Sequence, residues 1–134
     1  MIKFFKKVLE IRSKEGHIHF RRWRLIEFFG RGIYLHHFTR ADQDKHLHDH
    51  PWNFYSLVLK GGYIEKTISG DVIRKPGNFG YIPGEKFHQI KSLPTGSSWT
   101  LIFRGKRFRE WGYLVDGKWM EHQKYRTLKR SGRL

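Results

Sequence analysis

The sequence predicts an all-β barrel or sandwich, because many short strand-like segments follow one another with turn residues between them and almost no internal helical pattern. Aromatic and β-branched residues fill these segments, and such residues suit a pleated, half-buried sheet. Gly, Pro, Asn and Asp separate the segments and favour turns. The expected strands cover residues 18–28, 33–38, 52–59, 63–68, 72–74, 79–82, 88–93, 99–103 and 111–115.

The 134 residues suffice for one domain with a hydrophobic core, and no Pro-, Gly- or Ser-rich linker divides them. We expect a barrel over about 17–116. Residues 1–14 alternate Lys with apolar residues at helical spacing, which predicts a short amphipathic N-terminal helix. Residues 117–134 are expected to form a basic C-terminal tail.

Composition limits both location and chemistry. Cysteine is absent, which excludes disulfides and thiolate metal sites, so any metal must be held by nitrogen and oxygen. The first residues lack the apolar run of a signal peptide or membrane span, so we expect a soluble cytoplasmic protein without a membrane partner.

The chain is strongly basic. Its 27 Lys and Arg outnumber its 12 Asp and Glu, giving a formal net charge of +15. Such a charge attracts anionic ligands, and nucleic acid is a secondary candidate partner. The basic residues are spread along the chain, however, and such residues usually form a solvated surface.

Histidines cluster in the segment HLHDHPW. Because side chains alternate faces along an extended strand, His46, His48 and His50 are expected to project from one side, where neutral imidazoles can bind one metal ion. Asp49 is expected to face away from them and to form a salt bridge or fix a turn. Of His36 and His37, one is expected to face inward as a buried structural histidine.

The same segment resembles the first motif of the cupin superfamily. In that motif two histidines separated by one residue precede a glutamate and, six residues later, a glycine. Here His48 and His50 are followed by Phe54 and Gly61 at the corresponding spacing. Phe54 replaces the glutamate that is a fourth metal ligand in many cupins, and Asp42 replaces an upstream glycine.

A second segment resembles the second cupin motif, which runs from a glycine through a proline and a glycine to a histidine and an asparagine. Gly77, Pro83 and His88 lie at the required offsets. Glu85 stands at the usual glycine, and Ser92 stands at the usual asparagine. The two motifs together span residues 48–92.

The resemblance implies a double-stranded β-helix, or jelly-roll barrel, with a divalent metal held by His48, His50 and His88. His46 remains open as an alternative ligand, an outer contact or a residue of the barrel rim. Three imidazoles accept Fe(II), Zn, Ni, Cu, Co or Mn, and Fe²⁺ is the choice for a redox role.

Residues on the ligand face are expected to line a substrate pocket. Trp52, Phe54 and Ser56 share the strand parity of the histidines and predict an apolar pocket with one hydroxyl. Tyr81 is placed with them, and Glu65 is a further candidate.

Two functions are compatible with this site. The first is a metal-dependent enzyme, either a dioxygenase or an isomerase or epimerase, acting on a small polar or anionic substrate; no catalytic residue is assigned. The alternative is a non-catalytic module that binds an anionic ligand or nucleic acid. We also expect a homodimer, formed where the strand at 18–28 would leave an open sheet edge.

Overall fold

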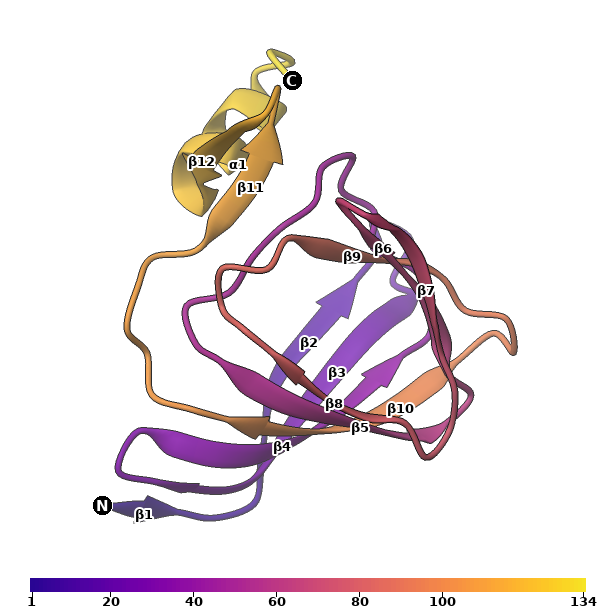
Figure 1. The fold of residues 1–134 in the computed structure, drawn as a ribbon, viewed down its shortest axis with the longest axis vertical. Helices are drawn as coiled ribbons and strands as arrows, with labels where there is room; N and C mark the ends of the chain where they lie inside the picture. The colour runs from indigo at the N-terminus through magenta and orange to yellow at the C-terminus, as the bar shows by residue number, and fades with distance from the viewer.

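Two antiparallel sheets enclose a common interior in the computed structural model, which describes all 134 residues, and a C-terminal hairpin and helix lie at one end (Figure 1). The predicted all-β jelly-roll architecture is confirmed. The elements are β1 (Ile2–Lys3), β2 (Lys6–Arg12), β3 (Ile18–Phe28), β4 (Arg31–Phe38), β5 (Phe54–Lys60), β6 (Tyr63–Thr67), β7 (Gly70–Arg74), β8 (Phe79–Ile82), β9 (His88–Ser92), β10 (Ser98–Arg104), β11 (Gly112–Val115), β12 (Lys118–Glu121) and α1 (His122–Arg130).

The larger sheet has the order β1-β3-β4-β10-β5-β8, with β2 also paired to β3. Strand β10 therefore lies between β4 and β5 and pairs antiparallel with both, although neither is its neighbour in sequence. The smaller sheet has the order β7-β6-β9, and β11 pairs with β12.

Alternation along the strands separates the interior from the outer face. On β5, Phe54, Ser56 and Val58 are buried, whereas Tyr55 is exposed. Two apolar clusters form inside the barrel. One comprises Tyr34, Phe54, Ile82 and Ile102 with Trp52 packed against it, and the other comprises Val58, Tyr63 and Ile90 with Phe38 and Leu93.

The predicted N-terminal helix is wrong, because residues 6–12 form strand β2 along the edge of β3. Strand β3 is 11 residues long and would otherwise leave a row of unpaired backbone groups. Phe, Val and Ile also fit a strand, so sheet pairing prevails over the helical spacing. Because β1 and β2 occupy this edge, the open edge expected for dimer formation at 18–28 does not exist.

The predicted tail at 117–134 is also wrong for most of its length. Asp116 and Gly117 have φ values of 50° and 76°, and two successive positive values form the tight turn that joins β11 to β12. The Glu121 side chain then accepts hydrogen bonds from the backbone N–H groups of Gln123 and Lys124 and caps α1.

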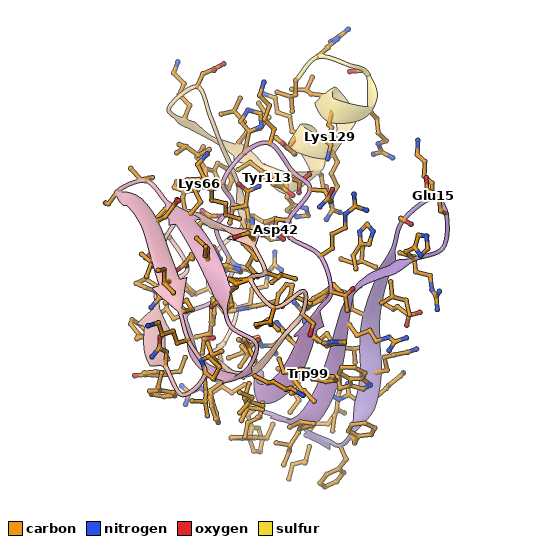
Figure 2. The ribbon with its side chains drawn as sticks, turned by 90° about the vertical axis from the view of Figure 1, so that its right-hand side faces the viewer. Glu15, Asp42, Lys66, Trp99, Tyr113 and Lys129 are labelled. Carbon is orange, nitrogen blue, oxygen red and sulfur yellow. The ribbon has the colours of Figure 1, made fainter.

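Helix α1 is anchored to the barrel by tyrosines. The Tyr125 side chain is 1% exposed and stacks on Tyr113, with 3.7 Å between ring centroids. Asp44 accepts hydrogen bonds from the Tyr113 hydroxyl at 2.9 Å and from Lys129 at 2.5 Å. Figure 2 shows Tyr113 and Lys129 at the same end of the molecule. This nine-residue helix is too short and too polar to cross a membrane.

Candidate metal centre

The segment that carries His48 and His50 joins β4 to β5 in the sequence. In space it is extended and lies between β9 and β11, because His48 forms β-bridges to His88 and to Tyr113. His48 and His88 exchange backbone hydrogen bonds of 3.0 and 2.9 Å, and the Asp49 N–H donates to the Gly112 carbonyl at 3.0 Å. These bonds fix the extended conformation, so His48 and His50 point to one side and Asp49 to the other.

The structure brings three histidines together in the interior. Nitrogen atoms of His48, His50 and His88 all lie within 4.8 Å of one another, a separation that could hold one metal ion. The ring centroids are 4.8–5.2 Å apart, and the Nε2 atoms of His50 and His88 are 3.4 Å apart. The cluster contains three imidazoles and no carboxylate.

Burial keeps the imidazoles of His48 and His50 neutral. It lowers the pKa of His48 to about 3, with the neighbouring His88 acting in the same direction. Burial also lowers the pKa of His50 well below its ordinary value. A neutral imidazole has a free lone pair on one nitrogen, and this is the form that binds metals.

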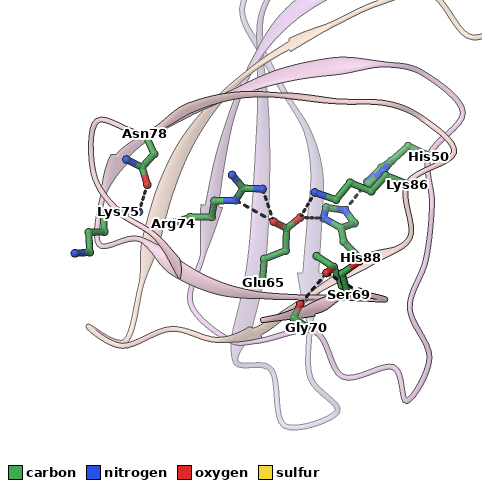
Figure 3. A network of polar contacts seen from close by, with 10 residues as sticks. His50, Glu65, Ser69, Gly70, Arg74, Lys75, Asn78, Lys86 and His88 are labelled. Carbon is green, nitrogen blue, oxygen red and sulfur yellow. Dashed lines mark hydrogen bonds and ion pairs between the residues drawn. The ribbon is translucent and has the colours of Figure 1, made fainter. Parts of the chain in front are cut away.

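A buried carboxylate orients the third histidine. Glu65 on β6 is 1% exposed, and its Oε1 lies 2.6 Å from Nδ1 of His88 (Figure 3). Arg74 donates two hydrogen bonds to Oε2, at 2.9 Å from Nε and 2.7 Å from Nη2, and Lys86 lies 3.8 Å from Oε1.

Glu65 is ionised in this environment. Burial alone would raise the pKa of its carboxyl, but the hydrogen bonds of His88 and Arg74, together with the charge of Arg74, lower it to about 2. An ionised carboxylate only accepts hydrogen bonds, so Nδ1 of His88 must donate. The Nε2 lone pair of His88 is thereby directed toward the other histidines, an outer-shell arrangement common around metal ligands.

Asp49 has the structural role predicted for it. Its Oδ2 accepts from Arg109 at 2.6 Å and from the indole of Trp119 at 3.1 Å, and its Oδ1 accepts from the Gly112 N–H at 2.6 Å. The side chain is 1% exposed and ties the histidine segment to β11 and β12.

His46 lies outside the cluster. Its Nδ1 is 2.9 Å from the hydroxyl of Tyr125, so the ring faces the C-terminal helix rather than the other histidines. Of the two histidines on β4, His36 faces the interior and lies beside His50, whereas His37 stacks on Trp99 at 3.9 Å.

The predicted pocket residues divide between two spaces. Trp52 and Phe54 line a small interior cavity of about 50 Å³ that also borders His50. Ser56 is buried on β5 and lines neither space. Tyr81 is half-exposed and lines an outer groove of about 480 Å³, because strand alternation turns it away from the interior.

Sequence reasoning missed two interior side chains. The sequence predicts Glu65 only as a pocket residue, and its contact with His88 depends on the pairing of β6 with β9. Arg22 is one of the basic residues expected on the surface, but alternation along β3 with the buried Phe20 places it inside. That alternation could have identified it.

Comparison with known proteins identifies the fold. No protein-family model and no curated protein matches the sequence. Among solved structures, Fe(II) HppE aligns with a TM-score of 0.61 and 13% identity over 75% of this chain and 57% of that chain. The cupin-2 domain protein Rru_A2000 from Rhodospirillum rubrum aligns with a TM-score of 0.61 and 13% identity over 94% of this chain and 82% of that chain.

A third structure is a sugar phosphate isomerase of a cupin superfamily from Silicibacter pomeroyi, with a TM-score of 0.52 and 19% identity over 71% of this chain and 66% of that chain. This chain therefore spans just over half of HppE and about two thirds of the isomerase. Likeness at these identities establishes the fold, and the chain has the fold of the cupins.

Proposed function

We propose that this chain, having the cupin fold, is a metal-dependent enzyme that holds one divalent metal through His48, His50 and His88 and acts on a small anionic molecule. The observation that carries the proposal is the convergence of three imidazoles without a carboxylate, two of which, His48 and His50, are neutral because burial lowers their pKa. A structural site normally completes its shell with protein ligands, whereas three ligands leave positions open for substrate.

The protein residues around the cluster have separate tasks. Glu65 fixes the tautomer and orientation of His88, while Trp52 and Phe54 exclude water on the side of His50. When bound, the metal supplies Lewis-acid or redox chemistry at its open positions. Because Phe54 adds no negative charge where the cupin motif has glutamate, the site retains the full metal charge and favours an anion.

The comparisons support this choice of chemistry. HppE was solved as an Fe(II) protein, and another neighbour is named a sugar phosphate isomerase. We therefore propose Fe²⁺ as the metal and either oxygen-dependent oxidation or isomerisation as the reaction. Zn, Ni or Mn would serve in the second case.

An activity screen tests the proposal. Fe(II)-loaded protein is expected to consume oxygen with a small organic acid, or metal-loaded protein is expected to isomerise a sugar phosphate. His88→Ala should lose the activity, whereas His37→Ala, which changes a histidine on the outer face, should keep it. Phe54→Glu should bind metal more tightly but turn over more slowly, because the new carboxylate can occupy an open position. Metal-loaded protein that remains inactive across both substrate classes, with no change in the metal's spectrum on adding substrate, would leave the metal structural.

A second candidate function is binding of single-stranded nucleic acid on the outer groove. Tyr55 and Tyr81 are half-exposed in this groove, with 5.0 Å between their ring centroids. Arg31 and Lys106 border the same groove and have no ion-pair partner. Exposed aromatic rings stack on bases, and cations attract phosphates. The net charge of +15 favours the same partner.

A fluorescently labelled oligonucleotide tests the second candidate. Its affinity is expected to fall log-linearly with salt, because phosphate contacts release counterions. Tyr81→Ala should weaken binding, while Ile73→Ala, which removes an exposed side chain of β7, should not. Binding that is absent at physiological salt, or that prefers a duplex, would count against this function.

A further inference from the structure

Two arginines border the interior cavity beside the histidine cluster. Arg22 of β3 and Arg104 of β10 line it together with His50, Trp52 and Phe54, and no acidic residue contributes to its wall. The wall of this cavity therefore carries two guanidinium groups and no carboxylate, since the Glu65 carboxylate that contacts His88 does not line it.

Arg22 lacks a counter-ion. It belongs to none of the ion pairs of the chain, and its single hydrogen bond runs from Nε to Nε2 of His36 at 3.0 Å. Burial lowers the pKa of the Arg22 guanidinium to about 10, with Arg104 acting in the same direction, so the group still carries its charge at neutral pH. Burial likewise lowers the pKa of His36 well below its ordinary value, which leaves His36 a neutral acceptor.

Arg104 is only partly neutralised. Its Nη2 lies 3.7 Å from a carboxylate oxygen of Glu27, and its guanidinium lies over the rings of Tyr34 and Trp52. Its Nε is buried and has no hydrogen-bond partner. Buried charges are costly unless they are paired, so two such groups around one cavity need an explanation.

A purely structural role explains only part of the arrangement. The bond to His36 uses one of the five N–H donors of Arg22, and the contact with Phe20, 5.6 Å from the ring centroid, uses none. The terminal nitrogens of Arg22 donate to no protein acceptor. The planar guanidinium group of Arg22 therefore has unused N–H donors. Such a group suits a carboxylate or phosphoryl group, which accepts two parallel hydrogen bonds.

We propose that Arg22 and Arg104 form an anion-binding site inside the barrel that holds the carboxylate, phosphate or phosphonate group of the molecule on which the histidine cluster acts. The cavity of about 50 Å³ is close to the volume of two water molecules, so it accommodates the head of such a ligand rather than a whole substrate. The remainder of the ligand extends past His50. Only the link to the metal rests on the proposed function.

Calorimetric titration of metal-free protein with inorganic phosphate and with methylphosphonate tests the anion site by itself. Arg22→Met is expected to weaken binding by about tenfold or more, because hydrogen bonds to a charged group are lost. Arg22→Lys keeps the positive charge but not the planar pair of donors, so its affinity for these anions should lie between those of wild type and Arg22→Met. Arg21→Met is the matched control, since the neighbouring Arg21 pairs with Glu10 instead. Wild-type protein that does not bind either anion, or equal losses in Arg22→Met and Arg21→Met, would overturn the site.

Nuclear magnetic resonance of the wild-type protein keeps the test decisive if Arg22→Met does not fold. Phosphate should shift the indole signal of Trp52, which lines the cavity, and leave that of Trp119 unchanged. An unshifted Trp52 signal would overturn the proposal.

The link to the metal has its own measurement. In Co(II)-loaded protein, methylphosphonate is expected to change the visible spectrum of wild type but not of Arg22→Met. If the protein takes up no metal, the proposed function fails, while the titration of metal-free protein still decides the anion site. If metal binds and methylphosphonate binds without any spectral change, the link is refuted.

Discussion

His88→Ala is expected to abolish metal binding that wild-type protein shows at about one ion per chain. His88 supplies one of only three imidazoles, so its loss should weaken metal binding by more than the roughly 10–100-fold typical of losing an outer-shell partner. His50→Ala should behave in the same way. Elemental analysis after reconstitution with a defined metal and removal of excess provides the measurement.

Two controls separate a lost ligand from a lost fold. His37→Ala should retain the metal, because His37 stacks on Trp99 away from the cluster. Thermal melting of metal-free His88→Ala should remain cooperative, because both interior apolar clusters are intact without that side chain. Equal metal contents in wild type and His88→Ala would exclude the assigned site.

Glu65→Gln is expected to lower the free energy of unfolding by roughly 3 kcal/mol, because breaking a buried ion pair leaves its partner unpaired. This value is at the lower end of the usual range because the Arg74 side chain is 24% exposed. Metal affinity should also fall by roughly 10–100-fold, since a neutral amide orients His88 less strongly. Chemical denaturation and competition with a chelator measure the two effects.

A surface glutamate provides the matched control. Glu10 pairs with Arg21 and Arg12 on the outside of the barrel, where solvent screens the charges, so Glu10→Gln should change stability far less than Glu65→Gln and leave metal affinity unchanged.

The double variant Glu65→Leu with Arg74→Met distinguishes the two roles of Glu65. Replacing the charged pair by apolar side chains should restore much of the stability but not the metal affinity. Wild-type stability and wild-type metal affinity in Glu65→Gln would show that this carboxylate neither holds the interior together nor positions His88.

Much of the fold follows from local patterns in the sequence. Strands β3 to β11 lie within a few residues of their predicted positions, because apolar alternation and turn residues act over short stretches of chain. The predictions fail at both ends for a shared reason. Residues 6–12 become a strand only because β3 offers them an edge, and residues 118–130 become a hairpin strand and a helix that pack through Tyr125.

The candidate site also contains some residues that local patterns predict and others that only strand pairing brings into place. Strand parity alone places His48 and His50 on one side and Asp49 on the other, and the structure has this arrangement. The resemblance to the second cupin motif implies His88 as the third ligand. Glu65 required the register of β6 against β9, which no local pattern specifies.

The sequence by itself thus determined the all-β architecture, the positions of the central strands and which side chains of the histidine segment share a face. These properties depend on alternation and turn preferences within a few residues. Only the tertiary structure decided that Glu65 holds His88, that His46 contacts Tyr125, and that Arg22 and Arg104 share a cavity with His50. Each of these contacts joins residues far apart in the chain, and strand order and register bring them together.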